Sequence, residues 1–309
     1  MQRELWKDLV LDAGYVGNRG VHLMILADYN QAVPNQPGQN LSLQARRPIP
    51  NFAYIEVAFG AGNSTYDALQ MKLEKRFSHG LYLLNSFTWS KALDNAPGHL
   101  EAYNGDQTRV NYANIANDKG YSNYNQPVND TVSLIWEVPF GKGRRFGSNS
   151  APVVESVLGG WKFTAINTAA SGLPINLTYS PTSQFQVSTA PNYRPNVSCD
   201  PVTPQGQRTT SNYLNKACVS APTDPGHPWG NASRNLVRGY PLYQFDLGLH
   251  KQFGLWHEST RLEFRAEAFN LLNQTNFQAP NSNISSSAFG SITSTFPARQ
   301  VQFAAKFLF

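Results

Sequence analysis

Four charged side chains recur at every second position of one short segment, and they are the clearest candidates for chemistry in the chain. Arg261, Glu263, Arg265 and Glu267 alternate with Leu262, Phe264, Ala266 and Ala268. This period of two predicts a strand with one charged face and one apolar face. The charged row either lines a path for a solute or is structural, with opposite charges pairing across strands in a wet lumen. Because such pairs are common and individually weak, the structural interpretation is favoured.

Residue types that support catalysis or metal binding are dispersed. The sequence contains no Gly-x-Ser-x-Gly or His-Glu-x-x-His pattern, so no nucleophile or metal site is indicated locally. The histidines stand apart from one another and from any cysteine cluster: His22, His79, His99, His227, His250 and His257. We therefore expect no enzyme activity, no metal and no cofactor.

Two glycine-rich segments resemble phosphate-binding motifs only superficially. Gly141-Lys-Gly-Arg-Arg145 lacks the spacing that lets backbone amides hold a phosphate, and we interpret it as a basic periplasmic joint. Gly14-Tyr-Val-Gly-Asn-Arg-Gly20 has no βαβ unit around it, and we interpret it as a turn at a rim. The net charge of +5 comes from scattered Lys and Arg side chains, so nucleic acid is not an expected partner.

Long polar segments contain the remaining candidates. Cys199 and Cys218 share one Gly-, Pro- and Asn-rich stretch, and an exported protein permits a disulfide there, although the sequence leaves the bonded and free states equally open. Tyrosines in these segments are suited to stacking on sugars or peptides, or else they only order the loops. They are Tyr103, Tyr112, Tyr121, Tyr124, Tyr193 and Tyr213.

The composition indicates that strands position these residues. Charged residues are 15% and aromatics 12% of the chain, with 23 Gly and 20 Pro. No apolar run approaches the ~20 residues of a membrane helix, so a membrane span must be built from strands. About eight strands are predicted from period-two patterns. They lie near residues 8–16, 65–78, 81–93, 129–139, 160–179, 243–253, 261–269 and 298–309.

The connections between these strands alternate in length. Residues 78–80 and 254–259 are tight turns, whereas 94–128, 180–241 and 273–297 are long. A transmembrane barrel shows this alternation, with turns in the periplasm and large loops outside. The joint at 140–159 is long for its side, which favours a small helix there. Residues 53–59 are either an extra strand or an arm of an extracellular hairpin.

Aromatic residues mark the ends of the predicted strands. The last strand places Val301, Phe303, Ala305, Phe307 and Phe309 on one face, and outer-membrane barrels end in this way because their assembly machinery recognises such a strand. Other aromatics fit the interfacial girdles of a barrel, although a soluble core also uses such residues. These are Tyr15, Trp89, Trp136, Phe140, Trp161, Phe163 and Phe253.

Seven segments in sequence order resemble the Oar-like barrel of TonB-dependent transporters, whose members often carry an N-terminal carboxypeptidase-regulatory-like domain. The resemblance covers nearly the whole chain, although each segment alone is weak. The segments are Ala13–Gly20, Asn63–Gly80, Ser86–Asp94, Val138–Phe146, Gly159–Trp161, Phe264–Asn273 and the terminal strand.

This resemblance implies a barrel of about 22 strands around a plug, of which residues 1–309 are expected to be the C-terminal part. No signal peptide, plug domain or TonB box is recognised, so TonB would act only through a missing N-terminal part. The implied function is import of a bulky solute, with outer-membrane lipid, the barrel assembly machinery and an unidentified extracellular ligand as partners. The alternatives are a surface-binding or adhesion barrel without transport, a self-contained eight-stranded barrel, and a soluble β-sandwich lectin.

Overall fold

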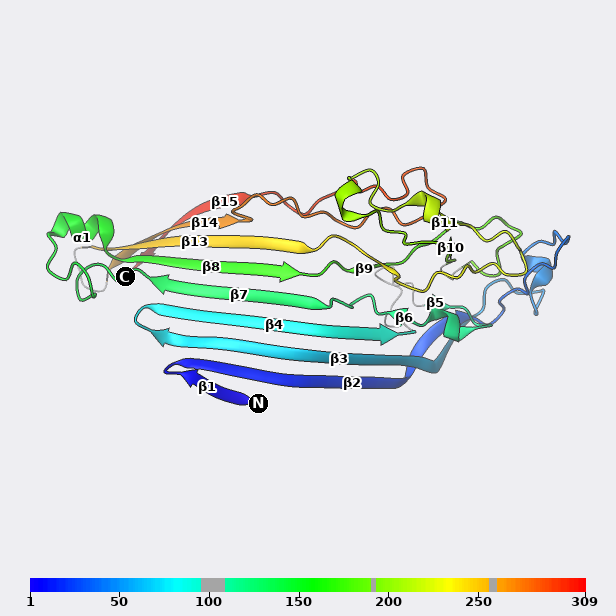
Figure 1. The fold of residues 1–309 in the computed structure, drawn as a ribbon, viewed down its shortest axis with the longest axis horizontal. Helices are drawn as coiled ribbons and strands as arrows, with labels where there is room; N and C mark the ends of the chain where they lie inside the picture. Colours follow the sequence, from blue (N-terminus) through cyan, green and yellow to red (C-terminus); the bar gives the residue numbers. More distant parts are fainter. Residues whose placement is uncertain (96–108, 190–192, 256–259) are drawn as a thin grey trace.

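The computed structural model describes residues 1–95, 109–189, 193–255 and 260–309. Within them one 11-stranded sheet has the order β1-β2-β3-β4-β7-β8-β13-β14-β15, with β5 and β6 paired beside this path (Figure 1). Neighbours along the path are antiparallel. The strands of the path are β1 (Gln2–Trp6), β2 (Leu9–Asp28), β3 (Glu56–Ser78), β4 (Leu81–Asp94), β7 (Val128–Glu137), β8 (Trp161–Ala170), β13 (Leu242–Gly254), β14 (Arg261–Phe269) and β15 (Gln300–Leu308).

The remaining elements are short and belong mostly to the connections. The strands among them are β5 (Arg109–Val110), β6 (Gly120–Tyr121), β9 (Pro174–Ile175), β10 (Asn196–Val197), β11 (Val219–Ser220) and β12 (Val237–Arg238). The helices are α1 (Pro152–Leu158) and the 3-10 turns η1 (Gln44–Arg46), η3 (Ile115–Asp118), η4 (Gln205–Gln207) and η5 (Lys216–Cys218). In the described part of the chain, no helix has the length and apolar character to cross a membrane.

The all-β, antiparallel prediction is confirmed, and each of the eight predicted strand positions contains a strand. The prediction missed β1, which is only five residues long and alternates too briefly to be recognised. It also ended β2 and began β3 in the wrong places. Residues 56–62 extend β3 and pair with the end of β2, so they form an arm of a long hairpin rather than an extra strand.

The interpretation of Gly14–Gly20 as a rim turn is wrong. These residues lie inside β2, and Gly14 and Gly20 pair with Gln70 and Ser64 of β3. The ring of Tyr15 lies so close to Gly17 that a Cβ at Gly17 would be 2.8 Å from the Tyr15 hydroxyl. Glycine is therefore used here to let an aromatic side chain lie across the backbone, which a strand tolerates.

Short and long connections alternate, as predicted. The β3–β4 turn consists of His79 (φ 51°) and Gly80 (φ 79°), a two-residue turn with both φ values positive. The β7–β8 joint contains α1, the small helix expected there. The long connections all leave the opposite end of the sheet, where they gather into a wide mass (Figure 1). Residues 256–259 of the predicted β13–β14 turn lie outside the described residues.

The register gives the sheet one apolar face and one polar face, because residues paired across antiparallel strands point to the same side. Trp136, Phe163, Leu249, Ala266 and Phe303 form one continuous row across five strands. The neighbouring row on this face consists of Leu134, Ala165, Leu247, Ala268 and Val301. The other face carries Lys162, Thr164, Asp246, His250 and Glu263, so the sheet separates an apolar environment from a polar one.

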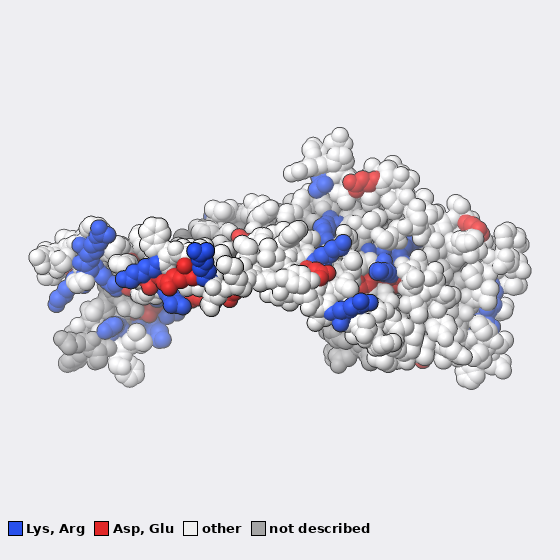
Figure 2. Space-filling view, turned by 60° about the horizontal axis from the view of Figure 1, so that its bottom comes forward, with Lys and Arg blue, Asp and Glu red and all other residues white. Residues whose placement is uncertain are grey.

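The buried apolar core lies among the connections rather than on the sheet. Its largest cluster joins two long connections and consists of Ile175, Leu177, Tyr213, Leu214, Val219, Val237, Phe289 and Ile292. A second cluster, at the ends of β2 and β5, contains Ile25, Ala27 and Val110. Figure 2 shows this wide end as largely uncharged surface, whereas charged side chains of both signs gather along the narrow part formed by strands.

Candidate functional site

The candidate site is the set of long connections at the wide end, which we name the loop assembly. It consists of the described parts of residues 29–55, 109–127, 171–241 and 270–299. They share one end because antiparallel strands return the chain there after every second crossing. The assembly is a folded unit, since buried polar side chains connect segments that are far apart in the sequence.

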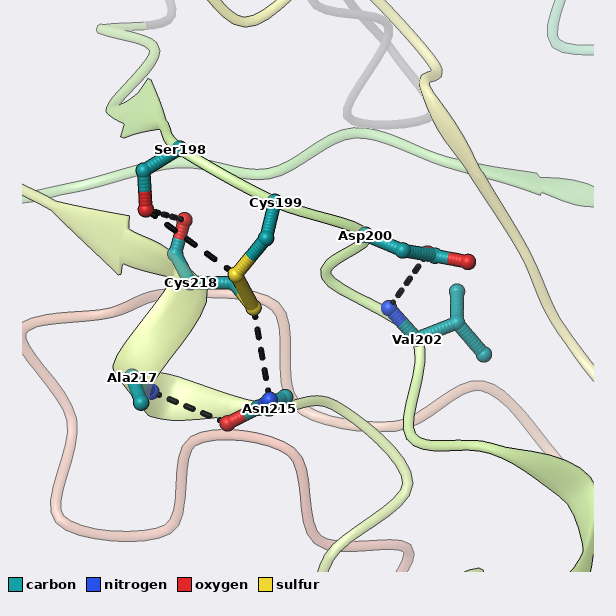
Figure 3. Close-up of a disulfide and its surroundings, with 7 residues drawn as sticks. All are labelled: Ser198, Cys199, Asp200, Val202, Asn215, Ala217 and Cys218. Carbon is teal, nitrogen blue, oxygen red and sulfur yellow. Dashed lines mark hydrogen bonds between the residues drawn. A yellow bond between two sulfur atoms is a disulfide. The ribbon is translucent and has the colours of Figure 1, made fainter.

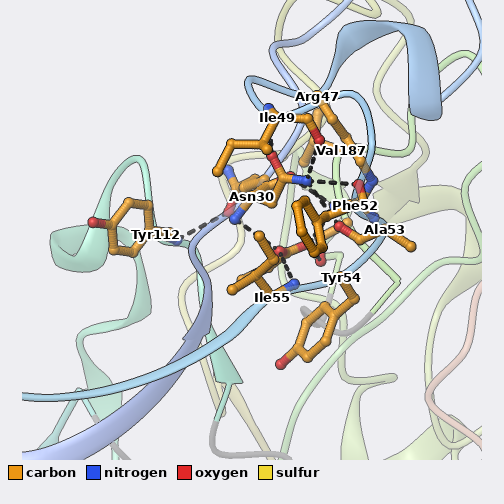
Figure 4. A network of polar contacts seen from close by, with 12 residues as sticks. Asn30, Arg47, Ile49, Phe52, Ala53, Tyr54, Ile55, Tyr112 and Val187 are labelled. Carbon is orange, nitrogen blue, oxygen red and sulfur yellow. Dashed lines mark hydrogen bonds and ion pairs between the residues drawn. The ribbon is translucent and has the colours of Figure 1, made fainter.

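One polar network is centred on Asp28 at the end of β2. Figure 4 shows its residues Asn30, Arg47 and Ile49. Arg47 Nη1 lies 3.1 Å from Asp28 Oδ2 and donates to Asn30 O at 2.6 Å. Ser188 Oγ donates to the same carboxylate oxygen at 2.7 Å, across 160 positions of sequence. Asn30 in turn donates to the carbonyls of Ile49, Phe52 and Ala53. These contacts fasten residues 29–55 to residues 171–241.

Arg46 has a similar role beside this network. Its guanidinium donates to the carbonyls of Val33 at 2.6 Å and Gln186 at 2.6 Å. Burial away from water lowers the pKa of Arg46 from its ordinary value. Four backbone carbonyls accept its hydrogen bonds, those of Leu41, Val33, Ser183 and Gln186.

Two further buried arginines connect residues 171–241 to the end of β4 and to the segment that follows it. Arg194 Nη1 lies 2.7 Å from Asp118 Oδ1, and its Nη2 donates to Asn117 O at 2.6 Å. Arg234 forms an ion pair with Asp94, the last residue of β4. Both residues of the Arg234–Asp94 pair are buried, so removing either leaves a buried, uncompensated charge.

A disulfide closes part of the same assembly. Cys199 and Cys218 are bonded, with their Cα atoms 5.0 Å apart. The side chain of Asn215 contacts the bond, because its Nδ2 lies 3.3 Å from Cys218 Sγ (Figure 3). Its Oδ1 accepts a hydrogen bond from Ala217 N. The bond ties β10 and β11 together beside the main apolar cluster.

The predicted loop tyrosines divide into two groups. Tyr193 and Tyr213 are buried and hold the loops together, so the hypothesis that they contact a ligand is wrong. Tyr193 Oη accepts from Val187 N and donates to Ser188 O, and burial raises the pKa of this phenol. Their sequence surroundings are as polar as those of exposed tyrosines, which is why composition did not separate them. Tyr103 lies outside the described residues.

The other tyrosines remain at the surface. Tyr112 is 37% exposed and packs edge-on against Tyr29 and Phe59, with ring centres 5.6 Å and 5.8 Å away. We name Tyr29, Phe59 and Tyr112 the aromatic cluster. Tyr29 was missed by the sequence analysis because it directly follows a strand that had been predicted to end much earlier. Tyr124 is exposed elsewhere, and Tyr121 lies under the guanidinium of Arg238.

The charged row on β14 is internally paired. Glu263 accepts from Arg265 Nε at 2.6 Å and lies 3.4 Å from His250 Nδ1. Glu267 accepts from Gln302 of β15 at 2.5 Å. Arg261 is exposed at the start of the strand. These contacts support the structural interpretation of the row, since Glu263 is paired within β14 and both Glu263 and Glu267 contact side chains of the neighbouring strands.

The terminal aromatic residues lie where the alternation predicts. Val301, Phe303, Phe307 and Phe309 are all exposed, and Phe303 stacks on Phe264 of β14 with ring centres 6.2 Å apart. Trp136 stacks on Phe163 in the same apolar face. Large exposed apolar rings in register on one face form a surface that suits lipid contact.

The histidines and carboxylates of the described residues are dispersed. Among the described residues, no group of three or more His, Cys, Asp or Glu side chains is placed to hold a metal ion. His99 and His257 lie outside the described residues.

Asp224 and His227 form an exposed pair 2.8 Å apart, and this hydrogen bond lowers the pKa of the Asp224 carboxyl. Gly141–Arg145 lies in the joint beside α1, where Lys142 N donates to Glu155.

Comparison with known proteins supplies the family. The family described as outer membrane beta barrel domain matches residues 1–302. No curated protein sequence matches the chain. Among solved structures, the outer membrane transporter YddB from Escherichia coli aligns with a TM-score of 0.48 at 9% identity, over 99% of this chain and 31% of that one. BauA, the ferric preacinetobactin receptor from Acinetobacter baumannii, aligns with a TM-score of 0.43 at 9% identity, over 97% and 27%. The chain thus spans less than a third of the length of either structure.

Proposed function

Because the chain belongs to the family of outer membrane beta barrel domains, we propose that it supplies wall strands and outer loops of a TonB-dependent barrel that imports a bulky solute. Its location is the bacterial outer membrane. The apolar face of the sheet then contacts lipid, and the polar face lines the interior. Capture of the solute needs no covalent chemistry, so we propose a binding and transport role without enzyme activity.

The loop assembly is the observation that carries this proposal. Asp28, Asp94 and Asp118 each form a buried ion pair with an arginine of another segment, so the outer surface is preformed rather than assembled around a ligand. A preformed surface loses less conformational entropy on binding than a set of flexible loops does. This favours specific capture over a simple permeation path.

The Oar-like resemblance of the seven segments supports a finer assignment within this family. We propose that the intact protein also contains a regulatory-like domain, a plug and a TonB box, and that TonB acts on the plug. The barrel assembly machinery is the proposed partner for folding, through the apolar row of β15. The alternative is a surface-binding or adhesion barrel, which the same rigid loop assembly also supports.

Uptake by whole cells tests import. Fluorescent oligopeptides and oligosaccharides too large for porins serve as probes, in cells with and without the intact protein and with and without TonB. Accumulation that needs both the protein and TonB supports the proposal. Protein-dependent binding at the surface without accumulation supports the adhesion alternative, and the absence of both contradicts the two functions together.

The aromatic cluster provides a residue-level test of capture. Replacing both Tyr29 and Tyr112 by alanine removes two stacking rings, each worth about 0.5–1.5 kcal/mol, so we expect about ten-fold weaker binding of the captured probe. Tyr124→Ala, at an exposed tyrosine outside the cluster, serves as the control. Equal losses in both variants would contradict a specific role for the cluster.

A further inference from the structure

Three polar side chains interrupt the apolar face of the sheet at neighbouring positions. They are Asn85 of β4, Asp130 of β7 and Asn167 of β8. Asn85 and Asn167 are both paired with Val132, one from each side, and Asp130 is paired with Phe87. Since paired residues point to one side, all three lie on the face that carries Trp136 and Phe163. We name them the polar patch.

The patch lies in the middle of the membrane-facing band. On β4 this band runs from Leu81, paired with Trp136, to Trp89, paired with Val128. Asn85 stands four positions from either end of that band. A membrane-crossing strand needs about 9–11 residues, so the band from Leu81 to Trp89 is about one bilayer core, with Asn85 near its centre.

The patch is only partly satisfied within the chain. Asn85 Nδ2 donates to Asp130 Oδ1 at 2.5 Å. Asn167 is exposed, and its side chain makes no hydrogen bond to any residue that the structure describes. A carboxylate accepts several hydrogen bonds and an amide both donates and accepts. Lipid tails satisfy none of these groups, and polar or ionisable residues at this depth mark contacts with other polar groups.

We propose that the polar patch is the contact between two copies of this chain side by side in the outer membrane. Donors and acceptors are both present in the patch, so two copies related by a two-fold axis satisfy each other, with Asn167 of one donating to Asp130 of its partner. Such a contact is self-complementary, as a two-fold interface requires. Ala165 and Ala169 flank Asn167 on the same face of β8, and small residues let two membrane surfaces approach closely.

Cysteine cross-linking in native outer membranes tests this contact, with the intact protein as its host. The chain contains no free thiol, since Cys199 and Cys218 are bonded to each other, so an added cysteine is its sole reactive one. Asn167→Cys should give a disulfide-linked species of twice the mass under mild oxidation. Ala268→Cys, on the same face of β14 but away from the patch, is the matched control and should not.

Every other result overturns the proposal. These results are no cross-link at position 167, equal cross-linking at 268 from random collision, and a product with the mass of a different protein. Asp130→Leu provides a second measurement that does not depend on thiols. It should weaken self-association in detergent about ten-fold, equivalent to about 1.4 kcal/mol, while the barrel stays folded because a lipid-facing polar group has been removed. Unchanged self-association in the folded variant would contradict the contact.

Discussion

At the scale of single residues, buried arginines decide how the outer surface is held. Arg47, Arg194 and Arg234 each reach a carboxylate that the chain supplies from a distant segment. A guanidinium suits this task because its fixed fork of donors satisfies carboxylate and carbonyl oxygens together. Sequence analysis could not find these pairs, since the partners are 19, 76 and 140 positions apart and lie mostly in irregular segments without periodicity.

Arg194→Leu should open the loop assembly locally. Asp118 would lose its buried partner, a change that costs about 3–5 kcal/mol when one member of such a pair is removed. Hydrogen exchange should become faster in residues 109–127 and 193–235, while β8 stays protected. Arg144→Ala is the control, because the Arg144–Glu137 pair is exposed and such pairs contribute about 0–1 kcal/mol. Similar exchange in both variants would contradict the role of burial.

Alkaline pH should loosen the same assembly through Tyr193. Burial raises the pKa of this phenol above its ordinary value of 10.0, so the folded chain keeps the proton after the unfolded chain has released it. Above about pH 10 the unfolded chain therefore holds fewer protons than the folded chain, so the contribution of this phenol to stability is constant below its ordinary pKa of 10.0 and falls as pH rises above it.

Limited proteolysis of residues 171–241 across this pH range measures that loosening. Tyr193→Phe should make the alkaline decline shallower, whereas Tyr124→Phe, at an exposed position, should leave it unchanged. A decline of the same steepness in Tyr193→Phe would show that other groups cause it.

At the scale of elements, strand positions were predictable and strand ends were not. Alternation of apolar and polar residues marks each long strand because one face is apolar and the other polar. The second half of β2 and the first part of β3 continue beyond the residues in which alternation is strict, so the alternation did not predict them. The glycines inside β2 led to the incorrect prediction of a turn, because glycine commonly indicates one.

The β3–β4 turn offers a test of an element that was predicted correctly. Gly80→Val places a β-branched residue at φ 79°, where its Cβ would lie 2.8 Å from Glu137 O. The left-handed conformation alone costs about 1–2 kcal/mol, so the urea midpoint of the refolded chain should fall. His79→Asn is the control, because Asn tolerates positive φ. Equal midpoints for Gly80→Val and the wild type would show that the turn does not set the hairpin.

The disulfide offers a second test at this scale, since the sequence left its state open. Replacing Cys199 and Cys218 by serine removes a link across 19 positions, which is worth about 3 kcal/mol for a loop of this size. We expect protease cleavage between positions 199 and 218 in this variant and in the reduced wild type. Resistance of both would mean that the apolar cluster alone holds the segment.

At the scale of the whole molecule, the separation of faces determines where the chain resides. Phe303→Arg places a charge on the lipid-facing surface, which costs about 0–1 kcal/mol near an interface and about 2–4 kcal/mol at the bilayer midplane. The folded fraction in lipid vesicles, seen as the band that shifts on heating, should drop. Gln302→Arg is the control one residue away, because position 302 faces the polar interior opposite Glu267. Equal losses would mean that the two faces are not solvated differently.

The same separation explains what the sequence could and could not say about the candidate site. Asn85, Asp130 and Asn167 break the apolar alternation of three predicted strands, so their signal was present in the sequence. Their proximity was not, because it depends on the register between β4, β7 and β8. The loop assembly depends even more on distant contacts, and composition indicated only that its segments are polar.

The lengths of β2 and β3 have a consequence for access from outside the cell. They contain 20 and 23 residues, whereas a tilted strand crosses the bilayer core with about 9–11. The remainder of β3, at about 3.3 Å per residue, raises this corner of the protein roughly 40 Å along the strand direction beyond the hydrocarbon. Because the aromatic cluster lies at the far end of this extension, it is held away from the membrane surface, where molecules too large to enter the barrel can reach it.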